Sequence, residues 1–232
     1  MDIHIINQCK DFDSYRAARV KSLFNAERGD TFELNISLPI EAEPWGLGLI
    51  VGPSGSGKTS IGKKIFGNAA RIVDLYKGWG EGPIIDEISP AGDFNQVTGA
   101  LANVGLGDVP AWLRPFKALS NGQQFRAGLA RVICDAPDQV VIDEFTSVVD
   151  RQIAKIGAMA FAKGWRRAAK GKQAVLLSCH YDIVDWLQPD WVYDTGKGEF
   201  KKKVNSAPGL QSTWNFGRSI TLIGLCLNRI TI

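Results

Sequence analysis

Residues 52–60 read Gly-Pro-Ser-Gly-Ser-Gly-Lys-Thr-Ser and fit the pattern G-x-x-x-x-G-K-[ST] in full. The apolar run Trp45–Val51 precedes them and predicts a buried strand, while Ile61–Phe66 after them predicts the opening of a helix. A strand, a glycine-rich loop and a helix in this order are the context of a phosphate-binding loop. The pattern therefore predicts an α/β fold.

The residue types in this loop suit the binding of an anion. Glycines let successive backbone N–H groups turn inward, and the start of a helix adds unpaired donors and a favourable dipole. Lys58 can reach the outer phosphates of a nucleotide, and the Thr59 hydroxyl can ligate magnesium. The alternative is a glycine-rich turn with an incidental lysine. The predicted nucleotide ligands are Gly52, Pro53, Ser54, Gly55, Ser56, Gly57, Lys58, Thr59 and Ser60.

Composition fits one large α/β domain with room for a small subdomain. The chain has 232 residues, of which 45% are apolar and 22% are charged, as in an ordinary globular protein. A net charge of +3 is too small to argue by itself for nucleic acid or membrane. The run Lys201–Lys203 predicts a solvated loop, with contact to a phosphate-rich partner as the alternative.

Cysteine spacing and the ends of the chain bear on the compartment. The four cysteines are scattered without a C-x-x-C pair, which argues against a disulfide framework or a zinc site. Residues 1–10 are too polar for a secretory signal, and no apolar stretch is long enough to span a bilayer. We expect a reduced cytoplasmic protein without a membrane span.

The run Val140–Glu144 predicts an apolar strand that ends in two acids. We expect it to lie next to the phosphate-loop strand in a parallel sheet, because ligands bind at the carboxyl edge of such sheets. Asp143 would then hold the magnesium shell and Glu144 would face the attacking water. A strand followed by a solvated acidic turn is the alternative.

A third apolar strand, Gln173–Cys179, ends at His180, one of two histidines in the chain. If it is parallel to the other two, the imidazole could reach the γ-phosphate region and donate a hydrogen bond or position the water. A hydrogen-bonded structural histidine is the alternative.

The segment Leu119–Arg126 predicts the start of a helix that runs over Gln123–Cys134. Ser120 has the character of an N-cap, and Gly122 allows close approach to the backbone. A polar helix start of this kind is a further place where an anion can bind. Many helices begin with serine, so this signal is weak alone.

Together these motifs resemble the ATP-binding cassette family in content and order, over roughly residues 31–200. The resemblance rests on the phosphate loop, the signature LSNGQ at Leu119–Gln123, the strand VVIDE at Val140–Glu144, a D-loop at Ser147–Asp150 and the switch histidine His180. It implies a P-loop NTPase fold with a mostly parallel sheet flanked by helices. An antiparallel β lead-in and a reduced helical subdomain complete the expected fold.

The resemblance also implies a composite site in an ATP-dependent homodimer, with ATP and Mg²⁺ as cofactors. Lys58 and the phosphate loop of one copy would bind phosphates, while the second copy would cap the γ-phosphate. The capping residues would be Ser120, Asn121, Gly122 and Gln123. Glu144 would be the catalytic base, and His180 would lie beside it. Thr59 and Asp143 would hold the metal. Asp150 would couple the two sites of the dimer.

Several positions depart from the family's pattern or are not fixed by it. Asn121 stands where the family has glycine, although asparagine tolerates left-handed backbone, and Phe145 stands where transporter cassettes have proline. Gln96 is the candidate for the Gln-loop residue at the metal, with an ordinary helix-start residue as the alternative. The expected helix here is Phe94–Val104.

The interval between Lys58 and Ser120 is short for a transporter cassette. In the family this interval carries the helical subdomain that docks on membrane subunits, here expected at roughly residues 90–135. The sequences of residues 143–152 and 178–191 resemble those of a non-transport branch of the family, in which cassettes are joined to acetyltransferase-like segments. We therefore expect a non-transport process with an unknown partner.

Three regions follow from these signals. Residues 1–30 predict a basic lead-in with a strand at Ile3–Ile6 and a helix at Phe12–Phe24, whose basic face is solvated or contacts nucleic acid. Residues 31–203 form the ATPase domain, beginning with an alternating strand at Thr31–Leu38, and residues 204–232 form an atypical tail.

Three functions remain open on the sequence. The leading one is an ATPase that hydrolyses the β–γ anhydride bond. The others are an ATP-dependent switch or scaffold with slow hydrolysis, and a phosphate-loop kinase, which has no use for a signature helix or His180. A transporter's ATPase subunit is a further variant of the first.

Overall fold

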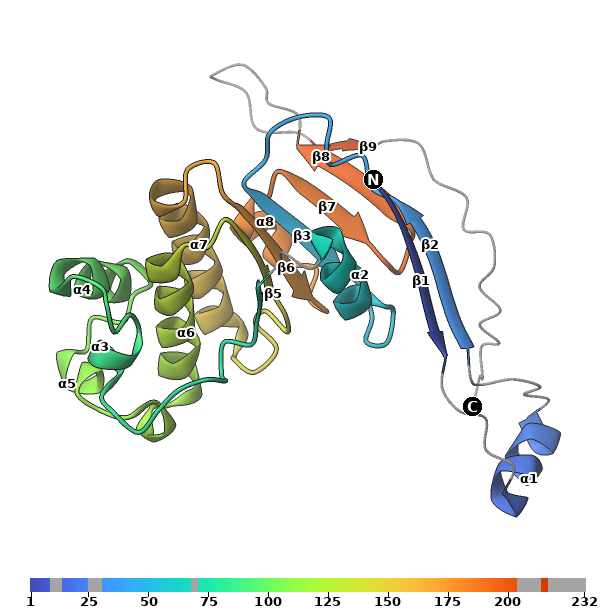
Figure 1. The fold of residues 1–232 in the computed structure, drawn as a ribbon, viewed down its shortest axis with the longest axis horizontal. Helices are drawn as coiled ribbons and strands as arrows, with labels where there is room; N and C mark the ends of the chain where they lie inside the picture. Colours follow the sequence, from blue (N-terminus) through green and yellow to red (C-terminus); the bar gives the residue numbers. More distant parts are fainter. Residues whose placement is uncertain (9–13, 25–30, 68–70, 204–213, 217–232) are drawn as a thin grey trace.

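The computed structural model describes residues 1–8, 14–24, 31–67, 71–203 and 214–216 (Figure 1). Within these residues, the larger sheet has seven strands in the order β4-β5-β6-β3-β7-β8-β9. Every pair from β4 through to β7 is parallel, and β8 and β9 continue the sheet antiparallel. Its strands are β3 (Leu47–Val51), β4 (Arg71–Val73), β5 (Gln139–Ile142), β6 (Gln173–Ser178), β7 (Trp191–Asp194), β8 (Glu199–Lys203) and β9 (Trp214–Phe216).

The predicted parallel sheet is confirmed, but one neighbour relation is wrong. We expected β5 to lie next to the phosphate-loop strand β3, whereas β6 lies between them and pairs with both. The reason is the connection: helix α7 (Arg151–Ala168) carries the chain from β5 to its parallel neighbour β6, and sequential strands commonly lie side by side. The carboxyl ends of all three strands still meet at one edge of the sheet.

The strand prediction for the N-terminal lead-in is also confirmed. Strand β1 (Asp2–Gln8) pairs antiparallel with β2 (Thr31–Ser37), so the lead-in and the start of the predicted ATPase domain share one small sheet. Helix α1 (Tyr15–Phe24) confirms the expected helix from Tyr15 onward; Ser14 is not helical, and residues 12 and 13 lie outside the described residues.

Helices cover both faces of the larger sheet (Figure 1). Helix α2 (Lys58–Ile65) and the β1–β2 pair lie on one face, and α7 lies beside α6 (Asn121–Asp135) on the other. The smaller elements beyond α6 complete the helical region. They are α3 (Ile84–Glu87), α4 (Phe94–Asn103), α5 (Val109–Trp112) and the 3₁₀ helix η2 (Phe116–Ala118), while α8 (Ile183–Leu187) packs against α7.

Alternating residues of the central strands belong to two separate hydrophobic cores, because successive side chains of a strand point to opposite faces of the sheet. In β5, Val140 and Ile142 join the core under α6 and α7, whereas Val141 joins the core under α2 and the β1–β2 pair. In β6, Leu176 and Leu177 divide in the same way. Continuous apolar runs are therefore explained by burial on both faces.

The run Lys201–Lys203 was predicted to be a solvated loop, and this is wrong. These residues form the end of β8 between β7 and β9, and each is half-buried. Long lysine stems can lie along a sheet while their ammonium groups reach carboxylates. Lys202 Nζ lies 2.7 Å from Glu43 Oε2.

Most of the predicted tail, 204–213 and 217–232, lies outside the described residues. Among the helices that are described, none is long and apolar enough to cross a membrane.

Candidate active site

A cavity of about 530 Å³ opens at the carboxyl edge of the parallel strands. The loops after β3, β5 and β6 supply much of its wall, and α2, β1 and the end of β6 supply the remainder. The cavity is lined by Asn7, Ser54, Gly55, Gly57, Lys58, Thr59, Ser60, Asp143, Glu144, Ser147, Leu177, Ser178 and Cys179. The structure therefore brings the predicted phosphate loop and the predicted acidic strand end into one site.

The phosphate loop has a backbone that depends on its glycines. Gly55 and Gly57 have φ values of 77° and 87°, in the left-handed region that favours glycine. Gly52 has a φ of 148°, and a Cβ on it would lie 1.9 Å from Thr195 Oγ1. The Thr195 hydroxyl in turn lies 2.6 Å from Ser56 Oγ. A side chain at Gly52 would therefore displace Thr195, which follows β7 and contacts the loop through Ser56.

Lys58 begins helix α2 and is held at the loop. Its Nζ donates to the carbonyl oxygens of Gly52 and Pro53 at 2.9 and 2.7 Å. An ammonium group has three donors, so one donor remains beyond these two bonds. The positive charge, the loop amides and the start of α2 all lie at the cavity, an arrangement that suits a phosphate group.

Thr59 and Asp143 form the part of the site that suits a magnesium ion. The Thr59 hydroxyl lies 3.4 Å from Asp143 Oδ1, so two hard oxygen donors converge from different elements. The described residues contain no group of three or more His, Cys, Asp or Glu that could hold a metal by themselves. Magnesium in nucleotide sites takes one or two protein oxygens together with phosphate oxygens, so this donor set fits.

Glu144 follows Asp143 on a tight turn and is exposed within the cavity wall. Its φ is 53° and that of Thr146 is 68°, two non-glycine residues in the left-handed region. Such backbone costs free energy and persists only where its surroundings fix it. Here the Glu144 amide donates to Asp143 Oδ1 at 2.9 Å, and the next amide, of Phe145, donates to Leu177 O at 2.9 Å.

His180 and Asp150 lie on segments that flank the cavity. His180 is half-buried just beyond Cys179, and its backbone amide donates to Ser178 Oγ at 3.2 Å. Asp150 is the N-cap of α7, and its Oδ1 accepts from the amides of Gln152 and Ile153 at 2.9 and 3.0 Å. Within one chain Asp150 thus has a structural contact, and its predicted coupling role remains a prediction.

The signature segment does not line this cavity within one chain. Ser120 is the N-cap of α6 in a capping box: its Oγ accepts from the Gln123 amide at 3.4 Å, and Gln123 Oε1 accepts from the Ser120 amide at 3.0 Å. Asn121 and Gly122 form the first residues of this helix. The four predicted capping residues are therefore together at one helix start, apart from the phosphate loop of their own chain.

The structure does not bring Gln96 to the magnesium ligands. It lies in α4, where its side-chain amide donates to Cys134 O at 3.1 Å. The helix-start alternative describes its position correctly. A different segment, the end of β4, lies beside Asp143, because the Asp143 amide donates to Val73 O at 3.2 Å. Asp74 directly follows Val73 at this edge of the sheet.

Sequence reasoning missed two residues, Asn7 in the wall of the phosphate-loop cavity and Asp74 at the neighbouring end of β4. Asn7 lines the cavity from β1, and its Nδ2 donates to Ser60 Oγ at 3.2 Å. Asp74 ends a strand of only three residues, too short to show a periodic pattern. Neither position carried a local signal, because each is placed by long-range strand pairing, of β1 with β2 and of β4 with β5.

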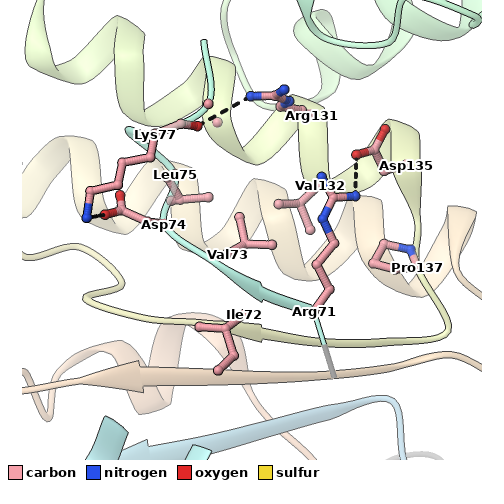
Figure 2. A pocket seen from close by; sticks show the side chains of 12 residues that line it. Arg71, Ile72, Val73, Asp74, Leu75, Lys77, Arg131, Val132, Asp135 and Pro137 are labelled. Atoms are coloured by element: carbon pink, nitrogen blue, oxygen red, sulfur yellow. Dashed lines mark hydrogen bonds and ion pairs between the residues drawn. The ribbon is translucent and has the colours of Figure 1, made fainter. Parts of the chain in front are cut away.

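A second cavity, of about 300 Å³, lies between β4 and α6 (Figure 2). Its rim carries two ion pairs, Arg71–Asp135 at 2.8 Å and Lys77–Asp74 at 2.9 Å. Burial acts to raise the pKa of Asp74, but the hydrogen bonds from Lys77 and the Tyr76 amide outweigh it and lower that pKa. This cavity therefore lies where the edge of the sheet meets the helical region.

Curated relatives match parts of the chain, and no protein-family model matches it. A probable metal transport system ATP-binding protein of Thermotoga maritima is 28% identical over 156 residues, covering 58% of this chain and 62% of the relative. The zinc import ATP-binding protein ZnuC of Jannaschia sp. is 36% identical over 134 residues, covering 50% and 54%. The putative 2-aminoethylphosphonate import ATP-binding protein PhnT of Salmonella typhimurium is 30% identical over 165 residues, covering 57% and 44%.

The chain thus spans between 44% and 62% of the length of these relatives. All three carry the names of transport or import systems, so the expected link to a non-transport branch has no support among them.

Solved structures identify the fold. The dimeric bacterial ABC transporter cassette MJ0796 aligns with a TM-score of 0.55 at 14% identity, covering 73% of this chain and 89% of that one. Its post-hydrolysis state bound to ADP and Pi gives 0.56 at 16% identity, with 75% and 93% coverage. The chain has the P-loop NTPase fold of the ATP-binding cassette ATPases, and the curated relatives that it matches are named as ATP-binding proteins.

Proposed function

We propose that this chain is an ATPase that binds Mg·ATP at the phosphate-loop cavity and hydrolyses the β–γ anhydride bond. The observation that carries the proposal is the meeting of Lys58, Thr59, Asp143 and Glu144 around one cavity of about 530 Å³. Their elements are far apart in the sequence, and parallel pairing of β3, β6 and β5 delivers them to one edge.

Each residue has a role that its position permits. The loop amides and Lys58 would hold the β- and γ-phosphates, and Thr59 and Asp143 would share a magnesium ion with phosphate oxygens. Glu144 would orient a water and accept its proton as the water attacks the γ-phosphorus and ADP leaves. Positioning and charge stabilisation account for most of the catalysis in phosphoryl transfer, which suits a site with few reactive side chains.

A second copy of the chain would complete the site. Ser120, Asn121, Gly122 and Gln123 start a helix of 15 residues but do not line the cavity of their own chain. A helix start carries unpaired amides that can face a phosphate. The cassette MJ0796 is described as dimeric, which supports an ATP-bound dimer here. Asp150 would then couple the two sites across the interface.

For the work that hydrolysis drives, the names of the curated relatives favour a transport system over the non-transport process expected from the sequence. The second cavity is a candidate docking place for the partner. It lies between the edge strand β4 and helix α6, and α6 begins at the signature segment. Sedimentation of ATP-locked Glu144→Gln protein with native membranes would support a membrane partner. Its recovery only in the soluble fraction would favour the non-transport alternative.

Steady-state turnover with ATP and Mg²⁺ tests the proposed activity. Lys58→Ala and Glu144→Gln should each abolish phosphate release, whereas Lys63→Ala and Glu81→Gln should not. Lys63 is an exposed lysine of the same helix, and Glu81 is an exposed glutamate away from the cavity, so they match the two charge changes. ATP binding without turnover would indicate the slow switch, and transfer of phosphate only to an added acceptor would indicate a kinase.

A further inference from the structure

The segment after β6 is attached on two sides by the residues that follow His180. Tyr181 OH donates to Asp194 Oδ1 at 2.9 Å, toward the phosphate-loop side of the sheet. Asp182 forms a two-point ion pair with Arg151, in which Nε to Oδ2 measures 3.0 Å. The predicted catalytic histidine therefore lies directly before two anchoring side chains that point to different elements.

The Tyr181 contact leads to the phosphate loop. Asp194 is 5% exposed, and its Oδ1 also accepts from the Gly196 amide at 2.9 Å. The intervening residue Thr195 contacts Ser56 Oγ at 2.6 Å, and its amide donates to Val51 O at 2.8 Å. Burial and the hydrogen bond to Asp194 raise the pKa of Tyr181 to about 12, so the phenol keeps the proton that it donates.

The Asp182 contact leads to the turn that carries Glu144. Arg151 directly follows Asp150, and its Nη1 lies 3.5 Å from the hydroxyl of Thr146, which is buried. The guanidinium also lies over the Trp186 ring, 5.0 Å from its centroid. A planar guanidinium held by a carboxylate, a hydroxyl and an aromatic face has a defined orientation, even at a partly exposed position.

We propose that Tyr181 and Asp182 are positioning residues that fix His180 between the phosphate loop and the Glu144 turn. The inference rests on the proposed ATPase function for its kinetic consequence, although the geometry that it describes does not. Both side chains are partly exposed, and surface contacts of this kind contribute little to folding stability. Their loss should therefore affect the placement of His180 more than the fold.

The kinetic test compares each variant in two backgrounds. Tyr181→Phe and Asp182→Asn should lower kcat by about threefold to tenfold with KM and melting temperature unchanged. In a His180→Ala background the same substitutions should cause no further loss, because they act through the missing imidazole. An equal loss in both backgrounds would overturn the proposal. Tyr193→Phe is the matched control, since it removes a phenol hydroxyl one residue from Asp194.

A spectroscopic test decides the point without turnover. The chain has two histidines, so in a His4→Gln protein the remaining imidazole NMR signals belong to His180. Tyr181→Phe should shift or broaden these signals, while Tyr193→Phe should not. Unchanged His180 signals in Tyr181→Phe would refute the positioning role. Should the wild type release no phosphate, the ATPase proposal fails alone and the NMR result still stands.

Discussion

The cavity at the phosphate loop and the cavity between β4 and α6 are built in different ways. The first is shaped by backbone: three parallel strands end together, and glycines turn the loop so that amides face inward. The second is shaped by side chains of an edge strand and a helix, which the Arg71–Asp135 ion pair joins. A backbone-built site has a sequence motif, whereas a site built by packing has none.

The largest expected effects lie at the first cavity. Lys58→Ala should abolish ATP binding, because it removes the ammonium beside the loop. Glu144→Gln should keep ATP binding but lower kcat by at least about 10²–10³-fold, because it removes the group that orients and deprotonates water. Binding is checked by calorimetry and turnover by phosphate release.

ATP binding by Lys58→Ala as tight as that by Lys63→Ala would contradict the assignment of the first cavity as the nucleotide site. That outcome would place the nucleotide elsewhere in the chain.

Packing beneath the first cavity gives the next largest effect. Phe145 is 0% exposed, and its ring lies 5.7 Å from that of Phe125 and 6.1 Å from that of Phe161. Phe145→Ala should lower the free energy of unfolding by about 3–5 kcal/mol, because it leaves a cavity in the core. Denaturant titration measures this, and a change below about 1 kcal/mol would show that the turn after β5 is not held by this ring.

The reactivity of two thiols can compare the first cavity, which Cys179 lines, with the protein interior, where Cys134 is buried. Cys179 is exposed and lines the cavity, whereas burial and the nearby Asp135 raise the pKa of Cys134 to about 11. At pH 8 a maleimide should label Cys179 faster than Cys134, because the thiolate is the reactive form. Mg·ATP should slow labelling of Cys179 and leave Cys134 unchanged, as judged by peptide mass spectrometry in a Cys9→Ser, Cys226→Ser protein. Equal protection of both thiols would point to a global effect of ATP.

The second cavity should show only small effects on folding. The Arg71–Asp135 pair is partly exposed, so Arg71→Ala should change the free energy of unfolding by less than about 1 kcal/mol.

A pH scan examines the other ion pair of that rim. The pKa of Asp74 is lowered in the fold, so its contribution to stability is present above 3.8 and is lost as pH falls through the folded pKa. The melting temperatures of wild type and Asp74→Asn should therefore converge in acid. A gap that widens in acid would contradict the lowered pKa.

Sequence could predict the elements that carry a local pattern. The phosphate loop, the strands around Val51 and Ile142, and the helix from Asn121 were each found through a motif or an apolar run. The order of strands was not fixed, because β6 comes between β5 and β3 through a crossover that no local pattern encodes.

The remaining part of the site depends on long-range contacts. Asn7 reaches Ser60 only because β1 pairs with β2 beside α2, and Asp74 follows a three-residue strand. Gln96 was assigned by residue type, but its amide is satisfied by Cys134 O within the helical region. Asn7 and Gln96 contact residues that are distant in sequence, and β4 reaches this edge by pairing with the distant strand β5.

Light scattering of Glu144→Gln protein with and without Mg·ATP tests the composite site most directly. The account predicts that ATP doubles the mass from that of a single 25.3 kDa chain and that Asn121→Arg in the same protein prevents this. Asn103→Arg, at an exposed asparagine of α4, should still allow the dimer. A chain that binds ATP but keeps the mass of one copy would contradict the account.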